Sequence, residues 1–175
     1  MRKVSLYIAM SLDGYIATED GSVDWLFSAE DEDYGYYDFL AQIDTVLMGA
    51  KSYEFILNHG GEYPYPDQVN YVFTRNTHRP ADPNVEFVTE EIPAFVERLK
   101  NQPGKTIWLV GGGQINAQLL QAGLIDEIIL FIQPTVLGSG IPLFAGKVEM
   151  TSFALQSSKA YKSGMVEMIL TKKEK

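Results

Sequence analysis

The residues best suited to chemistry in this sequence form a run of three glycines, Gly111 to Gly113, between an apolar segment and a helix-like segment. The first turn of a helix has unpaired N–H groups and a partial positive charge, and glycines let a ligand approach the backbone without meeting a Cβ. The run therefore indicates a phosphate-binding turn, and the alternative is a tight turn whose glycines serve only close packing. A conventional Rossmann domain is disfavoured, because the spacing is not G-x-G-x-x-G and the run lies far from the N-terminus.

Two other junctions repeat this arrangement. The segment Gly49–Ser52, which includes Lys51, follows the strand-like residues 45–48, and Arg75 follows the strand-like residues 70–74. Parallel strands end at one edge of a sheet, so we expect the three junctions to lie together. Lys51 or Arg75 alone reads as a solvated charge, but cations at a shared edge of an acidic protein favour an anion site. An adenosine 2′-phosphate fits such a site, which favours NADP over NAD.

Composition narrows the classes of function. The 175 residues carry a formal net charge of −9, which argues against nucleic acid or an anionic membrane as the main partner. The sequence has no cysteine, so disulfides, thiolate metal sites and cysteine nucleophiles are excluded. His59 and His78 are the only histidines, so we expect neither a His-based metal site nor a Ser-His-Asp triad. We therefore expect no metal, and chemistry supplied by a bound organic cofactor that acts on a small molecule.

The N-terminal residues do not read as a targeting segment. Val4, Leu6, Ile8 and Met10 alternate as they would on a strand, and Asp13-Gly14 break the segment early. No apolar run is long enough to cross a bilayer. We expect a cytoplasmic protein with no membrane partner.

Strand-like and helix-like segments alternate along most of the chain, which predicts an α/β fold with a mostly parallel sheet covered on both faces. The last two strands have no helix between them and predict an antiparallel C-terminal hairpin at one edge of the sheet. We find no linker and expect one domain over residues 1–175. The expected strands are Val4–Met10, Thr45–Met48, Asn70–Thr74, Val85–Val88, Thr106–Val110, Glu127–Ile132, Phe153–Gln156 and Val166–Thr171. The expected helices are Tyr34–Ile43, Lys51–Leu57, Ile92–Lys100 and Ile115–Ala122, the last capped by Gly123.

A series of short motifs runs through nearly the whole chain: Leu12-Asp13-Gly14-Tyr15-Ile16-Ala17, Leu47-Met48-Gly49, Thr74-Arg75, Val110-Gly111-Gly112-Gly113, Leu119–Ile128, Pro134–Gly140 and Pro142-Leu143-Phe144. The order of these motifs resembles the dihydrofolate reductase superfamily, and within it the reductase domain of the bacterial riboflavin-biosynthesis deaminase/reductase. The resemblance implies a three-layer dihydrofolate reductase-like fold and an NADPH-dependent reductase. The stretch from His59 to Asp67 lacks the Asp-x-Pro-x-Leu element that is typical of riboflavin reductases.

The resemblance also implies roles for individual residues. Ala9 and Ile16 would border the nicotinamide, the first turns of two helices would hold the pyrophosphate and the adenosine phosphate, and the residues after the third strand would contact the adenosine. The implied cofactor-binding residues are Ala9, Ile16, Gly49, Ala50, Lys51, Ser52, Thr74, Arg75, Gly111, Gly112, Gly113, Gln114 and Ile115.

The acceptor side is less defined in the sequence. Dihydrofolate reductases place a tryptophan and then a helix carboxylate beside the hydride acceptor, and Trp25 matches the first feature. Asp33, Asp31 or neither supplies the second, since carboxylates in the first turn of a helix also stabilise its dipole. Asp24 is either a capping residue or a carboxylate of the site. Tyr34 belongs to an aromatic set that reads mainly as packing, but it can line a pocket for a flat substrate. The candidate catalytic residues are therefore Asp33 and Asp24, and the candidate substrate contacts are Trp25, Asp24 and Tyr34.

The function expected from these features is NADPH-dependent transfer of a hydride to a C=N or C=O of a small heterocycle, most like 5-amino-6-(5-phosphoribosylamino)uracil reduction. The alternatives are a dihydrofolate or pterin reductase, a catalytically silent NADPH-binding regulatory protein, and a protein that binds another phosphate. Riboflavin reductase domains commonly dimerise, and the apolar stretches Ile128–Ile132 and Leu137–Phe144 favour a homodimer.

Overall fold

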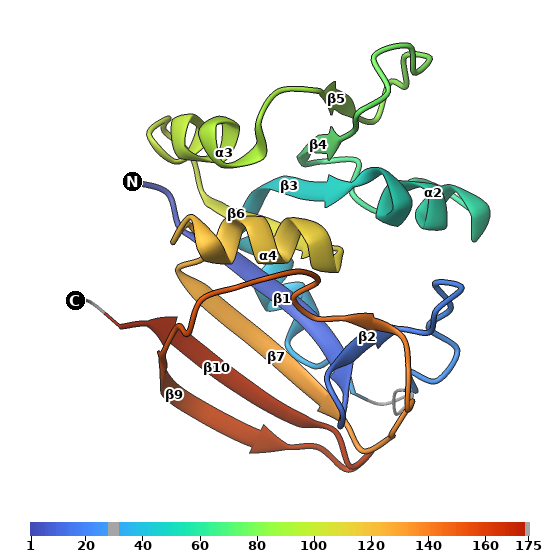
Figure 1. The fold of residues 1–175 in the computed structure, drawn as a ribbon, viewed down its shortest axis with the longest axis vertical. Coiled ribbons are helices and arrows are strands. Elements are labelled where there is room, and N and C mark those ends of the chain that lie inside the picture. Colours follow the sequence, from blue (N-terminus) through green and yellow to red (C-terminus); the bar gives the residue numbers. More distant parts are fainter. Residues whose placement is uncertain (28–31, 174–175) are drawn as a thin grey trace.

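The protein is built on an eight-stranded sheet in the order β5-β4-β3-β6-β1-β7-β10-β9 (Figure 1). The computed structural model describes residues 1–27 and 32–173. The strands of the large sheet are β1 (Val4–Ser11), β3 (Ile43–Gly49), β4 (Val69–Phe73), β5 (Glu86–Val88), β6 (Thr106–Gly111), β7 (Glu127–Gln133), β9 (Phe153–Ala160) and β10 (Val166–Lys172). The helices are α1 (Tyr36–Ala41), α2 (Ala50–Asn58), α3 (Ile92–Lys100) and α4 (Gly113–Gln121).

Six neighbouring strands of the sheet, from β5 to β7, run parallel. Only β10 and β9 run antiparallel to their neighbours, and together they form the C-terminal hairpin at one edge. The predicted α/β class, the mostly parallel sheet and the antiparallel hairpin are confirmed.

Helices cover the sheet from both sides. Strand residues such as Leu6 and Leu109 share one core with α3 and α4, whereas Trp108 shares a second core with α1 and α2. Neighbouring residues of one strand, such as Trp108 and Leu109, therefore face opposite layers. This explains why the central strands read as continuous apolar runs rather than as alternating ones.

The structure differs from the predicted elements at α1. Residues 34 to 43 were expected to form one helix, but Tyr34 and Gly35 have φ values of 55° and 71°, and the helix begins only at Tyr36. Left-handed backbone cannot continue an α-helix, so these two residues form the turn that precedes it. At the other end of the segment, Ile43 is already the first residue of β3.

Two short strands were not predicted, and a third strand is longer than predicted. β2 (Tyr15–Ala17) and β8 (Ile141–Pro142) form a separate two-stranded antiparallel sheet. β9 continues four residues beyond the expected end at Gln156. Strands as short as β2 and β8 carry no readable alternation, and the exposed polar half of β9 resembles a loop in composition.

One of the two apolar stretches that favoured a homodimer, Ile128–Ile132, is accounted for within the chain. β7 is an internal strand, with β1 on one side and β10 on the other, and Ile128, Leu130 and Phe131 are buried. The homodimer stays a prediction without that support. Across residues 1–27 and 32–173, none of the helices has the length and apolar character needed to cross a membrane.

Candidate functional site

The three junctions singled out in the sequence, which follow strands β3, β4 and β6, meet at one edge of the sheet. β3 lies between β4 and β6, with Gly49 paired to Phe73 and Met48 paired to Gly111. The junctions after β3, β4 and β6 are therefore neighbours in space. Ligands of α/β proteins bind at this carboxyl edge, so the arrangement is that of an extended anionic ligand site.

Two helix N-termini at this edge are open. Gly49 precedes α2 and Gly112 precedes α4, neither helix has a side chain that caps it, and neither first turn contains an acidic residue. Ala50, Lys51 and Ser52 form the start of α2, and Gln114 and Ile115 follow the first residue of α4. N–H groups left without a cap suit phosphate oxygens.

The three glycines of the run after β6 have different roles. A Cβ on Gly113 would lie 2.3 Å from the carbonyl oxygen of Pro142, so this glycine is required by packing. Gly111 has a φ of 113°, which favours glycine, and a cis peptide bond joins it to Gly112. A Cβ on Gly112 would meet only Ile16 Cδ1 and Ser52 Oγ, both at 3.9 Å. Gly112 is therefore the glycine that leaves space at the site, between two other predicted cofactor residues.

Ala9 lies near the carboxyl end of β1, between β6 and β7. It packs against a buried cluster formed by Phe131, Tyr161 and Met165. Ile16 comes from β2, which crosses beside α4 near Gly112. The two residues expected to border a nicotinamide ring thus approach the site from different strands.

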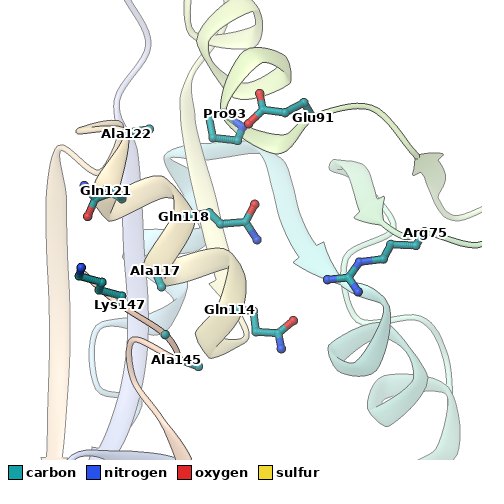
Figure 2. Close-up of a pocket in the computed structure, with 11 residues that line it drawn as sticks. Arg75, Glu91, Pro93, Gln114, Ala117, Gln118, Gln121, Ala122, Ala145 and Lys147 are labelled. Carbon is teal, nitrogen blue, oxygen red and sulfur yellow. The ribbon is translucent and has the colours of Figure 1, made fainter. Parts of the chain in front are cut away.

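A groove of about 550 Å³ lies beside α4 (Figure 2). Arg75 reaches toward it from the end of β4, and Gln114 and Gln118 point from α4 into the same space. Arg75 is exposed and makes no hydrogen bond or ion pair with any described residue. An unpaired guanidinium at the rim of a groove is suited to a phosphate.

The hydroxyl of Thr74 is already engaged. It accepts hydrogen bonds from the backbone N–H of Asn76 at 3.1 Å and from Arg79 Nε at 3.3 Å. Arg79 in turn pairs with Glu54 on α2. The sequence analysis did not single out Arg79, which holds the loop after β4 against α2 and so positions Thr74 and Arg75.

The two predicted catalytic carboxylates are exposed. Asp33 Oδ1 accepts a hydrogen bond from the backbone N–H of Gly35 at 3.2 Å, as expected for a residue that caps a turn. The N–H of Asp24 donates to Ser22 Oγ at 3.1 Å, and its own carboxylate lies at the surface. Asp31, the alternative to Asp33, lies outside the described residues. A proton-donor role for Asp24 or Asp33 stays a prediction.

Tyr34 and Trp25 have more enclosed surroundings. The ring of Tyr34 lies 4.7 Å from the ring of Tyr161, and its carbonyl oxygen accepts a hydrogen bond from Tyr7 Oη at 3.2 Å. Burial, with a smaller effect of Glu167, raises the pKa of Tyr7 well above its usual value, so its hydroxyl stays protonated. Trp25 Nε1 is buried and has no hydrogen-bond partner among the described residues.

The structure points to one carboxylate that the sequence analysis did not select. Glu32 Oε1 accepts a long hydrogen bond of 3.4 Å from the backbone N–H of Lys162, and Glu32 Oε2 is buried and has no hydrogen-bond partner among the described residues. In the sequence Glu32 lies between Asp31 and Asp33, the two residues considered for the helix carboxylate. Its side-chain direction depends on the non-helical turn before α1, which the sequence pattern did not reveal.

Within the described ranges, no group of three histidine or carboxylate side chains is arranged to hold a metal ion. The polar groups at the carboxyl edge are mainly hydroxyl, amide and backbone groups together with the cations Arg75 and Lys147, and Glu91 is the carboxylate among the residues that line the groove. This set suits an anionic organic cofactor.

Residues 2–167 of the chain match the RibD C-terminal domain. The chain belongs to the RibD C-terminal domain family. This membership confirms the resemblance to riboflavin-biosynthesis reductases and the dihydrofolate reductase-like superfamily. It supports a reductase of that family as the class of protein.

Similar proteins span nearly the same length as this RibD C-terminal domain. YwjB of Bacillus subtilis (strain 168) is 44% identical over 161 residues, which cover 91% of this chain and 92% of YwjB. A crystal structure of a putative riboflavin biosynthesis protein from Shewanella sp. PV-4 superposes with a TM-score of 0.87 at 25% identity, over 98% of this chain and 99% of that one.

The fold also recurs inside a larger protein. A diaminohydroxyphosphoribosylaminopyrimidine deaminase/5-amino-6-(5-phosphoribosylamino)uracil reductase from Thermotoga maritima matches with a TM-score of 0.74 and 15% identity. The match covers 98% of this chain but only 57% of that protein. At this level of identity the likeness shows the fold alone.

Proposed function

We propose that this protein is an NADPH-dependent reductase that transfers a hydride to a C=N or C=O carbon of a small heterocycle. The observation that carries the proposal is the backbone at Gly112, which lacks a Cβ and lies beside Ile16 and Ser52 between two uncapped helix N-termini. A backbone that lacks a Cβ beside free N–H groups fits a pyrophosphate.

Different residues at this edge contact different parts of the cofactor. The first turns of α2 and α4 bind the pyrophosphate through backbone N–H groups, and Ser52 adds a hydroxyl donor. Ala9 and Ile16 border the nicotinamide, which supplies the hydride when the cofactor is bound. Enclosure by these apolar residues keeps water from the transfer path and fixes the ring relative to the acceptor.

Arg75 selects the phosphorylated cofactor. Its guanidinium has no partner in the described chain and borders the groove that α4 lines with Gln114 and Gln118. An adenosine 2′-phosphate would pair with it by charge-assisted hydrogen bonds. The same groove would hold the adenosine of NADH without that pairing, so we expect a preference for NADPH.

The acceptor binds on the α1 side of β1 and β7, where Ala9 and Tyr34 pack with Phe131. Asp33 and Glu32, which directly precede the turn before α1, and Asp24 are the carboxylates that can donate the proton. The acceptor class most consistent with the family is a pyrimidine such as 5-amino-6-(5-phosphoribosylamino)uracil, and a pterin is the nearby alternative.

A catalytically silent NADPH-binding protein is the second candidate, and the exposure of Asp24 and Asp33 favours it. The test is to mix the purified protein with NADPH and a panel of pyrimidines, pterins and simple carbonyl compounds, and to follow the loss of dihydronicotinamide absorbance. The proposed reductase consumes NADPH with at least one member of the panel. Tight NADPH binding with no oxidation by any of them would favour the silent protein, and no binding of NADPH would contradict both.

A further inference from the structure

Gln133 at the end of β7 is fully buried, and neither its side-chain oxygen nor its side-chain nitrogen has a hydrogen-bond partner among the described residues. A buried amide without partners destabilises a fold. Native proteins keep such groups rarely, and each one calls for an explanation such as a function or a bound molecule. The side chain therefore indicates a partner that the described residues do not supply.

The register of the sheet places this amide beside the proposed nicotinamide site. Gln133 pairs with Ser11 in β1, and two residues earlier Phe131 pairs with Ala9. Side chains two residues apart on a strand share one face of the sheet. Because Phe131 packs against Ala9, Gln133 lies on the α1 side of the sheet, one pleat nearer to the carboxyl edge.

A second unpartnered polar atom lies at the same corner of the molecule. The turn between β9 and β10 covers Phe131 with Tyr161 and Met165, and the backbone N–H of Lys162 in this turn donates to Glu32 Oε1. Like the Gln133 amide, Glu32 Oε2 is buried and has no hydrogen-bond partner in the part of the chain that the structure describes. The corner therefore offers a donor and an acceptor from an amide, together with an acceptor from a carboxylate.

We propose that Gln133 is a substrate-recognition residue whose amide binds a lactam edge of the hydride acceptor, that is, a ring C=O next to a ring N–H. A side-chain amide presents one acceptor beside one donor, so it forms two hydrogen bonds with such an edge and leaves neither group unpaired. Glu32 Oε2 accepts from a further N–H of the same ring. This inference rests on the proposed function and names the residue that recognises the lactam edge which the proposed pyrimidine and pterin acceptors present.

The proposal predicts opposite effects of one substitution on stability and on binding. In Gln133→Met the buried amide is replaced by an apolar side chain of similar length, so the ligand-free protein should melt at a higher temperature than the wild type. The same change removes both hydrogen bonds to the ligand. A glutamine satisfied inside the fold would behave differently, because its loss would lower the melting temperature.

The probe is lumazine, a pteridinedione with lactam edges, and its matched control is 1,3-dimethyllumazine, which lacks the N–H groups. Binding is measured by fluorescence at equilibrium in the presence of NADP⁺, because a ligand reaches the enclosed amide only when the covering residues move apart. Gln102→Met is the matched variant, since it makes the same chemical change at an exposed position. Binding of NADPH is measured separately for every variant.

We expect the wild type to bind lumazine at least about tenfold more tightly than its dimethyl derivative, because the derivative leaves a buried amide unpaired. Gln133→Met should bind lumazine about tenfold more weakly than the wild type, discriminate little between the two probes and keep its NADPH affinity. Gln102→Met should behave as the wild type. Equal binding of both probes by the wild type, absence of lumazine binding, or a lowered melting temperature of Gln133→Met would overturn the proposal. If the wild type does not bind NADPH, the proposed function is contradicted instead. Failure of the Gln133 assignment and failure of the proposed function are therefore distinguishable.

Discussion

A Cβ on Gly112 would lie 3.9 Å from Ser52 Oγ, an ordinary van der Waals distance, so the residue that precedes α4 lies beside the first turn of α2. The neighbouring glycine has no such freedom, because a Cβ on Gly113 would lie 2.3 Å from the backbone oxygen of Pro142. The adjacent residues Gly112 and Gly113 therefore have different roles. Gly112 leaves room for a ligand, and Gly113 allows the loop at Pro142 to pack against α4.

This difference predicts opposite outcomes for two alanine variants. The methyl group of Gly112→Ala makes only ordinary contacts with Ile16 and Ser52, and the φ of −87° at this position suits any residue, so the melting temperature should change little. The methyl group occupies the space proposed for the pyrophosphate, and we expect NADPH to bind at least about tenfold more weakly through lost backbone hydrogen bonds to a charged group. Thermal unfolding and NADPH titration of the same preparation check both effects.

Gly113→Ala is the matched variant. Its methyl group collides with backbone, which flexible side chains cannot relieve, so the free energy of unfolding should fall by about 1–3 kcal/mol or more. A stable Gly113→Ala protein, or a Gly112→Ala protein with unchanged NADPH affinity, would show that the two roles are assigned wrongly.

Replacement of Arg75 tests the preference for NADPH. Arg75→Ala should weaken NADPH binding by about tenfold, the effect of one lost charge-assisted hydrogen bond, and should leave NADH binding nearly unchanged. Arg98→Ala is a suitable control, because it removes an exposed arginine that pairs with Glu90 away from the groove. Equal losses for the two cofactors would remove Arg75 from the 2′-phosphate.

Tyr53 and Asp82 predict a pH-dependent contribution to stability. Tyr53 Oη donates to Asp82 Oδ2 at 2.6 Å, and this hydrogen bond lowers the pKa of Asp82. A carboxylate with a lowered pKa in the folded state stabilises the protein above its unfolded pKa, about 3.9, and the contribution is lost as the pH falls through the lower folded value.

Tyr53→Phe should therefore reduce the free energy of unfolding at pH 7 by about 1–2 kcal/mol, and the difference from the wild type should shrink at acidic pH. Urea unfolding at a series of pH values measures it. A difference that stays constant, or grows, on acidification would contradict the role of the Asp82 carboxylate.

The cofactor side of the site could be predicted largely from the sequence. Glycines and cations directly after apolar strands have fixed positions once the strands are parallel, and Gly49, Arg75 and Gly111 indeed come together. The helix at Ile92–Lys100 also has the predicted limits, because Glu91 caps its N-terminus through a side-chain hydrogen bond to the N–H of Ala94.

The acceptor side could not be predicted in the same way. It is built from non-helical turns and strand ends, where side-chain direction depends on tertiary packing. Tyr34 was placed in a helix but has left-handed backbone, and Glu32, rather than Asp33, has a buried carboxylate oxygen. Gln133 carries no local signal, since a glutamine at the end of an apolar strand reads as the start of a loop. Its significance follows only from its complete burial.

The central claim is that the carboxyl edge of the sheet binds NADPH. Titration of the wild-type protein with NADPH and with NADH, followed by the fluorescence of the dihydronicotinamide and of the protein, tests it most directly. A saturable signal with both, and an affinity for NADPH about tenfold higher than for NADH, is the predicted result, since one charge-assisted pairing separates the two cofactors. No saturable signal with either cofactor would contradict the account.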